Sequence, residues 1–178
     1  MSDVHNRLSP EMIQRVAPDA TPEELLSQSG WFYLTEVFDV LDPEHTGKYK
    51  LTFKIMERMR SRGADPGRTM GGRKLGGRML VDMTVFAPWY RQNPLLKVQK
   101  IQEHMGFRDF LGQDAGIFRL SEVCRRFGNH LPFSYSVLKR GADREKDCRQ
   151  SMGVFKYDTT YLVELPSFEH WLRDQILS

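Results

Sequence analysis

The sequence predicts an α+β protein, mainly helical, with two tandem copies of one unit joined by a helix and preceded by a short helical arm. First, residues 70–91 align without a gap on residues 152–173, with eight of 22 positions identical. Second, both copies show the same order of patterns, which is helix, helix, hairpin, helix. We therefore divide the 178 residues into an arm (1–30), a first unit (31–93), a connecting helix (94–117) and a second unit (118–178).

The arm and the connecting segment both carry helical signals. "SPEMIQRV" and "TPEELLSQ" each place a proline at the first helical position after an N-cap residue, with acidic residues following, so two short helices are predicted in the arm. In the connecting segment, Val98, Ile101 and Met105 have the spacing of one helical face. We expect one amphipathic helix there, packed against one or both units as a rigid connection.

Each unit is predicted to begin with two helices. In "LTEVFDVL" and "LSEVCRRF", Thr35 and Ser121 are the expected N-caps of the first helix. Thr52 and Ser134 are the expected N-caps of the second helix, which in the first copy reads "FKIMERMRSRG" and ends near Gly63.

The stretch "MGGRKLGGRMLVDM" allows two interpretations, a backbone cradle for phosphates or a basic hairpin. The second copy replaces Gly76 and Gly77 with Asp158 and Thr159. A phosphate cradle depends on its glycines, whereas a hairpin turn accepts either pair. The stretch also lacks the Gly-Lys-Ser/Thr ending of a nucleotide-binding loop. We therefore predict a basic β-hairpin.

A closing helix follows each hairpin, in "VFAPWYR" and "SFEHWLR". Phe86 and Trp89 are three residues apart, as are Phe168 and Trp171. This spacing places each pair on one helical face, so we expect both pairs to pack in a core.

The net charge of +3 hides a strong asymmetry along the chain. Residues 1–47 hold two basic and nine acidic side chains, whereas residues 48–93 hold eleven basic and three acidic ones. A charge run is usually a solvated face, but positive charge concentrated in one block is also what a polyanion-binding surface requires. The first unit therefore carries the stronger signal for binding a polyanion.

This order of elements resembles the winged helix-turn-helix of phage and plasmid excisionases, which is related to the mercury-resistance-regulator (MerR) type. The resemblance rests on "YLTEVFDVL", "FKIMERMRSRG" and "RKLGGRMLVDM", repeated as "RLSEVCRRF", "YSVLKRGADR" and "FKYDTTYLVEL". The first copy departs from the family in its longer connection "DPEHTGKYK". The resemblance implies DNA binding, with the second helix in the major groove and the hairpin, as a wing, at the backbone or minor groove.

The predicted DNA contacts lie on the second helix and the hairpin of each copy. Lys54, Arg58 and Arg62 follow one another at intervals of four, and Lys74 recurs in the second copy as Lys156. Chance retention of solvated charges is the alternative explanation. The full predicted set is Thr52, Lys54, Arg58, Arg62, Arg73, Lys74 and Arg78 in the first copy and Ser134, Ser136, Arg140, Arg144 and Lys156 in the second.

Catalytic residues, metal ligands and cofactors are not predicted. The five histidines are scattered, and Asp82 and Glu164 are lone acids expected to pair with a neighbouring arginine. Cys124 and Cys148 are too few for a disulfide framework and are interpreted as reduced thiols. No run of eighteen apolar residues occurs and the start "MSDVHNRLSP" is polar, so we expect a soluble, cytoplasmic protein with no membrane partner.

The sequence thus predicts a non-catalytic protein that binds double-stranded DNA, as a transcription regulator or as an architectural factor in recombination or plasmid maintenance. The alternative is a winged-helix module that binds a protein and no DNA. The nearly neutral second copy, with the aromatic motifs "FSY" and "FKY", or the acidic arm would carry such a contact. Homodimerisation is left open.

Overall fold

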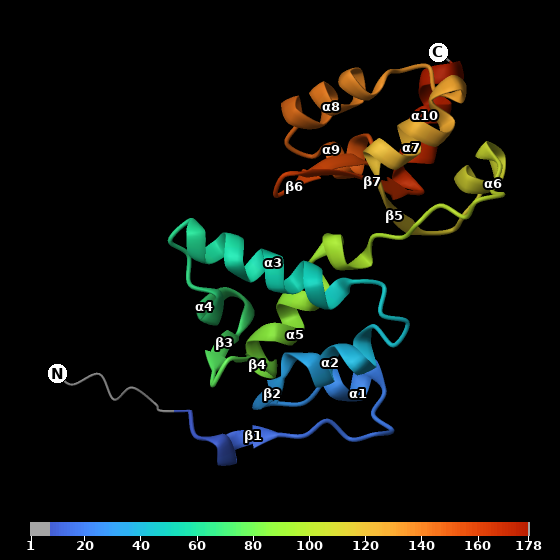
Figure 1. The fold of residues 1–178 in the computed structure, drawn as a ribbon. Helices are drawn as coiled ribbons and strands as arrows, with labels where there is room; N and C mark the ends of the chain where they lie inside the picture. Colours follow the sequence, from blue (N-terminus) through green and yellow to red (C-terminus); the bar gives the residue numbers. More distant parts are fainter. Residues whose placement is uncertain (1–7, 178) are drawn as a thin grey trace. The chain divides into compact units, whose positions relative to one another are not determined.

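The computed structural model describes residues 8–177, and the chain divides into two compact units. The first unit ends at Leu96 and the second begins at Lys97. Each unit combines short helices with one small sheet (Figure 1). The predicted α+β class is therefore confirmed.

The first unit contains a four-stranded sheet in the order β1-β2-β4-β3. Strand β1 runs parallel to β2, whereas β4 is antiparallel to both β2 and β3. The elements are η1 (Pro10–Met12), β1 (Ile13–Gln14), α1 (Pro22–Leu26), β2 (Trp31–Tyr33), α2 (Leu34–Leu41), α3 (Lys48–Ser61), α4 (Pro66–Met70), β3 (Gly72–Leu75), β4 (Arg78–Asp82), α5 (Met83–Gln92) and η2 (Pro94–Lys97), which extends one residue past the boundary.

The second unit repeats this plan with a three-stranded sheet in the order β5-β7-β6. A single parallel bridge between Val98 and Ile117 takes the place of the β1–β2 pairing. The elements are α6 (Phe107–Leu111), β5 (Gly116–Arg119), α7 (Leu120–Phe127), η3 (Gly128–His130), α8 (Tyr135–Arg144), α9 (Cys148–Ser151), β6 (Val154–Tyr157), β7 (Thr160–Leu165) and α10 (Ser167–Leu177).

The connecting helix predicted over 94–117 is wrong. From Val98 the chain pairs with strand β5, and the backbone N–H of Gln99 donates to the carbonyl of Ile117 at 2.8 Å. A short helix forms only after Gly106. The apolar spacing of this segment serves the sheet because tertiary pairing satisfies the backbone groups that a helix would have satisfied locally.

This segment and the N-terminal arm are the same part of the repeat. The carboxylate of Glu36 accepts a hydrogen bond from the backbone N–H of Val16, and Glu122 accepts one from that of Ile101, both at 3.2 Å. The predicted caps Thr35 and Ser121 are wrong, because helices α2 and α7 each begin one residue earlier than these side chains. The glutamates instead anchor the preceding segment.

The arm forms one of its two predicted helices as an α-helix. Helix α1 begins with a reciprocal capping box between Thr21 and Glu24, as "TPEELLSQ" predicts. The other predicted helix is reduced to the single 3₁₀ turn η1, and Ile13 and Gln14 then form β1. The arm therefore belongs to the first unit.

Helix α3 begins four residues before the predicted cap Thr52, which is buried inside the helix. Asp42 caps it instead, and its carboxylate accepts hydrogen bonds from the backbone N–H groups of Thr46, Gly47 and Lys48 at 2.9, 3.2 and 3.1 Å. Burial alone would raise the pKa of Asp42, but hydrogen bonds from the hydroxyl and backbone N–H of Thr46 and the backbone N–H of Lys48, with the charge of Lys48, hold that pKa below its ordinary value. The long connection "DPEHTGKYK" is thus ordered around one carboxylate.

Both predicted hairpins are confirmed. The turn residues Gly76 and Gly77 have φ of 54° and 82°, and Asp158 at the corresponding turn has φ of 53°. These positive angles suit a two-residue hairpin loop, in which glycine, asparagine and aspartate are favoured.

A second retained glycine supports the base of each hairpin. Gly71 and Gly153 both have φ of 69°. A Cβ atom would lie 2.6 Å from the Asp82 carbonyl oxygen at Gly71 and 2.1 Å from the Phe168 backbone nitrogen at Gly153. Glycine is therefore retained at this position for close backbone approach.

The closing helices α5 and α10 are confirmed, with Phe86 and Phe168 fully buried. Each phenylalanine ring packs against the predicted tryptophan, with centroids 5.6 Å apart for Trp89 and 6.0 Å apart for Trp171. These aromatic pairs contribute to the core of each unit.

Candidate nucleic-acid interface

A cleft of about 460 Å³ opens in the first unit between the start of α2, one side of α3 and the β3–β4 hairpin. We call it the α3–hairpin cleft. This volume lies within the range of about 300–1,000 Å³ that is common for ligand pockets. Its lining residues are Arg15, Tyr33, Thr35, Glu36, Tyr49, Phe53, Lys74, Gly77, Arg78 and Met79.

Two arginines from distant parts of the chain meet at one tyrosine ring in this cleft. The guanidinium carbons of Arg15 and Arg78 lie 5.9 and 5.2 Å from the ring centroid of Tyr33. The Arg15 Nη2 atom also pairs with Glu36 Oε1 at 3.0 Å. Both guanidinium groups thus lie near one ring, while the Arg15 side chain stays 75% exposed to solvent.

The hairpin supplies the third cation. Lys74 on β3 lies opposite Met79 on β4, so both side chains project from the same face of the hairpin, and both line the cleft. Arg73 is paired with Leu80 and projects from the other face. Arg78 is paired with Leu75, so its side chain starts from the face of Arg73 and contacts the ring of Tyr33. Lys74 and Arg78 both line the cleft, whereas Arg73 is exposed outside it.

Helix α3 lines the cleft with Tyr49 and Phe53. Lys54 lies about 100° further around the helix than Phe53, because an α-helix has 3.6 residues per turn. The predicted row of Lys54, Arg58 and Arg62 therefore lies on a neighbouring face, where Lys54 and Arg62 are exposed and Arg58 is half-buried.

Thr52 is wrong as a predicted DNA contact. Its side chain is fully buried, and its hydroxyl has no hydrogen-bond partner among residues 8–177. A group enclosed in the core of the unit does not reach a ligand.

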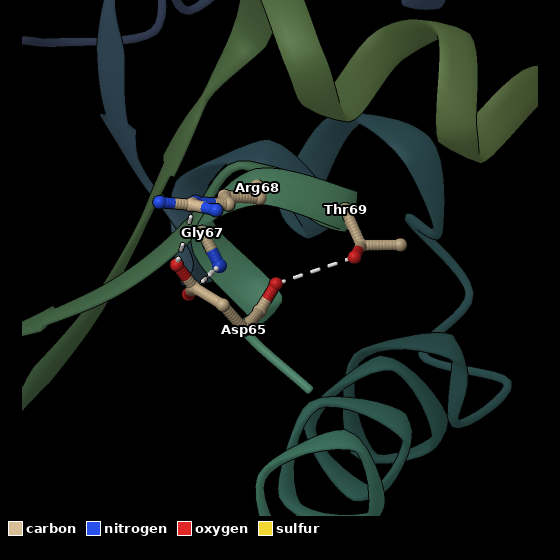
Figure 2. Close-up of polar contacts among 4 residues, drawn as sticks. All are labelled: Asp65, Gly67, Arg68 and Thr69. Carbon is tan, nitrogen blue, oxygen red and sulfur yellow. Dashed lines mark hydrogen bonds and ion pairs between the residues drawn. The ribbon is translucent and has the colours of Figure 1, made fainter. Parts of the chain in front are cut away.

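Helix α4, which sequence analysis missed, leads the chain from α3 into the hairpin. Figure 2 shows how Asp65 organises its first turn, accepting a hydrogen bond from the backbone N–H of Gly67 at 2.8 Å and pairing with Arg68 at 3.8 Å. The Thr69 hydroxyl also donates to the Asp65 carbonyl at 3.2 Å. The signal was present, because Asp followed by Pro is an N-cap with a proline at the first helical position.

In the second unit a side-chain hydrogen bond joins the hairpin to the second helix. The Tyr161 hydroxyl on β7 donates to the carboxylate of Asp143 on α8, with distances of 2.7 and 2.9 Å to its two oxygens. The ammonium groups of Lys139 and Lys156 lie 5.2 and 5.5 Å from the centroid of the same ring. The hydrogen bond to Asp143, with smaller contributions from burial and nearby charge, raises the pKa of Tyr161 to about 12.

The remaining predicted contacts of the second unit lie on or next to α8. Ser134 precedes this helix, as predicted, and the guanidinium Nε of Arg140 donates to the carbonyl of Ser136 at 3.3 Å. All of the predicted contacts in this unit are exposed, namely Ser134, Ser136, Arg140, Arg144 and Lys156.

Two other predictions concern the pairing of Asp82 and Glu164 with an arginine and the exposure of the aromatic motifs in the second unit. Glu164 pairs with Arg149 through two contacts of 2.6 and 2.7 Å, as predicted, and Asp82 caps helix α5 by accepting from the Thr84 backbone N–H at 3.0 Å. Of the aromatic motifs, Tyr135 is exposed but Phe155 is buried, with the Arg149 guanidinium 4.6 Å from its centroid. The motif "FKY" is therefore not a fully exposed aromatic surface.

The described part of the chain offers no group of three or more potential metal ligands. Within that same part, every helix is too short or too polar to cross a membrane. The chain matches no family model, no curated protein and no solved structure.

Proposed function

We propose that this chain is a sequence-specific or architectural DNA-binding protein built from two tandem winged helix-turn-helix units. It would act without catalysis in the cytoplasm, as a transcription regulator or as an excisionase-like factor in recombination or plasmid maintenance. In this proposal, α3 and α8 are the recognition helices, and the β3–β4 and β6–β7 hairpins are the wings.

The α3–hairpin cleft is the observation that carries the proposal. Arg15 comes from the arm and Lys74 and Arg78 from the hairpin, and all three line one concavity together with the carboxylate of Glu36. Adjacent to it, α3 exposes Lys54 and Arg62. A concave surface with converging cations is suited to the phosphate backbone, which dominates the affinity of proteins for DNA.

The salt dependence of binding to a random duplex tests this proposal. With four to six phosphates contacted, log K should fall against log[salt] with a slope of roughly −4 to −5, because each contact releases condensed counterions. The variant Lys74→Gln/Arg78→Gln should reduce the magnitude of this slope, whereas Lys156→Gln should reduce it less. Absence of binding at low salt, or a slope near zero, would reject DNA binding.

A protein partner for the second unit remains the second candidate. Helix α8 exposes Tyr135 and Val137, with 38% and 41% of their surfaces accessible. These apolar side chains lie in the unit whose hairpin and helix are joined by a hydrogen bond. Such a surface suits contact with a protein better than contact with the DNA phosphate backbone. If this candidate is correct, Tyr135→Ser/Val137→Ser leaves the salt slope unchanged and abolishes the partner contact.

A further inference from the structure

We infer that the α3–hairpin cleft is a binding site for one phosphate group, in which Arg15 from the N-terminal arm is a required ligand. This inference rests on the proposed function for the source of the phosphate, which we take to be the backbone of duplex DNA. A nucleoside monophosphate offers the same chemistry. Arg15 lies outside the motifs from which DNA contacts were predicted, 63 positions before Arg78.

The first argument is that the cleft has an excess of positive charge that its own carboxylate does not neutralise. Among the described residues that line the cleft, Glu36 is acidic and Arg15, Lys74 and Arg78 are basic. One carboxylate oxygen of Glu36 contacts Arg15 and the other accepts the backbone N–H of Val16. Glu36 therefore positions Arg15 while the cleft retains the charge that an anion requires.

The second argument is that both guanidinium groups have contacts within the protein near the cleft before any ligand binds. Tyr33 contacts both Arg15 and Arg78, and strand β1 places Arg15 beside β2 by pairing Gln14 with Phe32. An arginine side chain has five N–H donors in a planar fork, so one contact with Glu36 leaves donors for a phosphate. Preorganised donors lower the entropic cost of binding.

The third argument is that the second unit has lost this arrangement while keeping the fold. Lys100 occupies the position of Arg15, Arg119 that of Tyr33 and Thr160 that of Arg78, as the equivalent pairings show. The second unit therefore keeps a cation in place of Arg15 but lacks the tyrosine ring that contacts two arginines in the first unit. Lys156, the counterpart of Lys74, lies at the ring of Tyr161. The phosphate site is thus a property of the first unit, and the second unit is an internal comparison.

The test titrates the full-length protein with inorganic phosphate and with a deoxynucleoside monophosphate, followed by heteronuclear NMR. We expect saturable shifts of the backbone amides of Thr35, Gly77 and Arg78. Arg15→Gln and Arg78→Gln should each weaken binding by about tenfold, because a charge-assisted hydrogen bond contributes on that scale. Arg91→Gln, at the exposed end of α5, is the matched control and should leave the affinity unchanged.

A parallel titration with a DNA duplex identifies the source of the phosphate. Arg15→Gln/Arg78→Gln should lower the magnitude of the salt slope by about one unit, since both side chains contact the same phosphate. If the small ligands bind in the cleft but the duplex slope is unchanged, the site takes a free nucleotide. That result would support the phosphate site and remove it from the DNA surface.

The outcomes also separate this inference from DNA binding as such. DNA binding by the parent chain, with no saturable amide shifts and no effect of Arg15→Gln on the slope, would overturn the phosphate site and leave the proposed function in place. If the chain binds phosphate in a way that depends on Arg15 but binds no duplex, the phosphate site is supported and the proposed DNA binding is rejected. Circular dichroism of each variant establishes that the fold is retained.

Discussion

The two units share one scaffold and differ where the hairpin meets the second helix. In the first unit this junction is a cleft lined by Arg15, Lys74 and Arg78. In the second unit, Tyr161 on the hairpin is hydrogen-bonded to Asp143 on α8, and Lys156 is directed to the tyrosine ring. The same junction of the repeat is thus a cleft in one copy and is bridged by a side-chain hydrogen bond in the other.

The comparison identifies residues that both copies retain for the fold. Gly71 and Gly153 occupy equivalent places because the backbone leaves no room for a Cβ atom at either. Glu36 and Glu122 are retained because each anchors the segment before its sheet. Retention between copies therefore indicates structure at these positions. Of the cations of the cleft, Lys74 is retained as Lys156, whereas Arg78 is replaced by Thr160.

The largest expected effect concerns what the units share. Gly71→Ala and Gly153→Ala should each destabilise the protein by at least about 1–3 kcal/mol, since a non-glycine residue at positive φ is strained and the added Cβ meets backbone atoms. Chemical denaturation of the full chain measures this. Gly128→Ala is the control, because its Cβ would meet nothing within 4 Å and its φ is −55°. Wild-type stability in both test variants would mean that the retained glycines are not structural.

The next effect should differ between the units. Arg58→Ala and Arg62→Ala should each weaken binding to a preferred duplex by about 1–3 kcal/mol, the contribution of an arginine that reaches a base edge. Arg140→Ala and Arg144→Ala should weaken it less. Fluorescence anisotropy with each folded variant measures these affinities, and equal losses in the two units would remove the asymmetry that we propose.

A smaller effect is expected at the start of the first recognition helix. Asp42→Ala should destabilise the first unit by about 0.5–2 kcal/mol, the usual contribution of an N-cap. Because the pKa of Asp42 is lower in the folded protein, its stabilisation is present above the ordinary pKa of 3.8 and is lost as the pH falls through the folded value. Thermal unfolding against pH tests both statements. If the difference between Asp42→Ala and the parent persists unchanged at the acidic end, the carboxylate is not the cap.

The smallest effect concerns the hydrogen bond of the second unit. Asp143→Asn should lower the pKa of Tyr161 from about 12 towards its ordinary value of 10.0, because the carboxylate favours the neutral phenol. NMR of ring-labelled tyrosine during an alkaline titration measures this pKa. In the parent, the stabilisation from this bond is present below the ordinary pKa and is lost as the pH rises through the folded value. An unchanged pKa in the variant would show that the bond does not form in solution.

Local signals allowed the hairpins and closing helices to be predicted from the sequence. The turns at Gly76–Gly77 and Asp158–Thr159 depend on backbone angles that only a few residue types favour. Thr52 misled the prediction, because the residue that caps α3 is Asp42, which lies before a connection whose course the sequence does not reveal.

The cleft itself was only half predictable. Lys74 and Arg78 share the basic hairpin, but Arg15 reaches them through the parallel pairing of β1 with β2, a contact that depends on the tertiary fold. A signal did exist, since "IQRV" at 13–16 and "VQKI" at 98–101 are equivalent parts of the repeat. The apolar residues of the second segment also have helical spacing, so a helix was predicted there and the equivalence was missed.

Hydrogen-exchange mass spectrometry of the full chain, with and without a random duplex at low salt, tests the central claim most directly. The claim is that the first unit binds DNA between α3 and its hairpin. We predict that DNA slows exchange most in peptides covering residues 48–62 and 72–82, with less change over residues 135–161. Slower exchange confined to the second unit, or no change in either unit at saturating DNA, would contradict it.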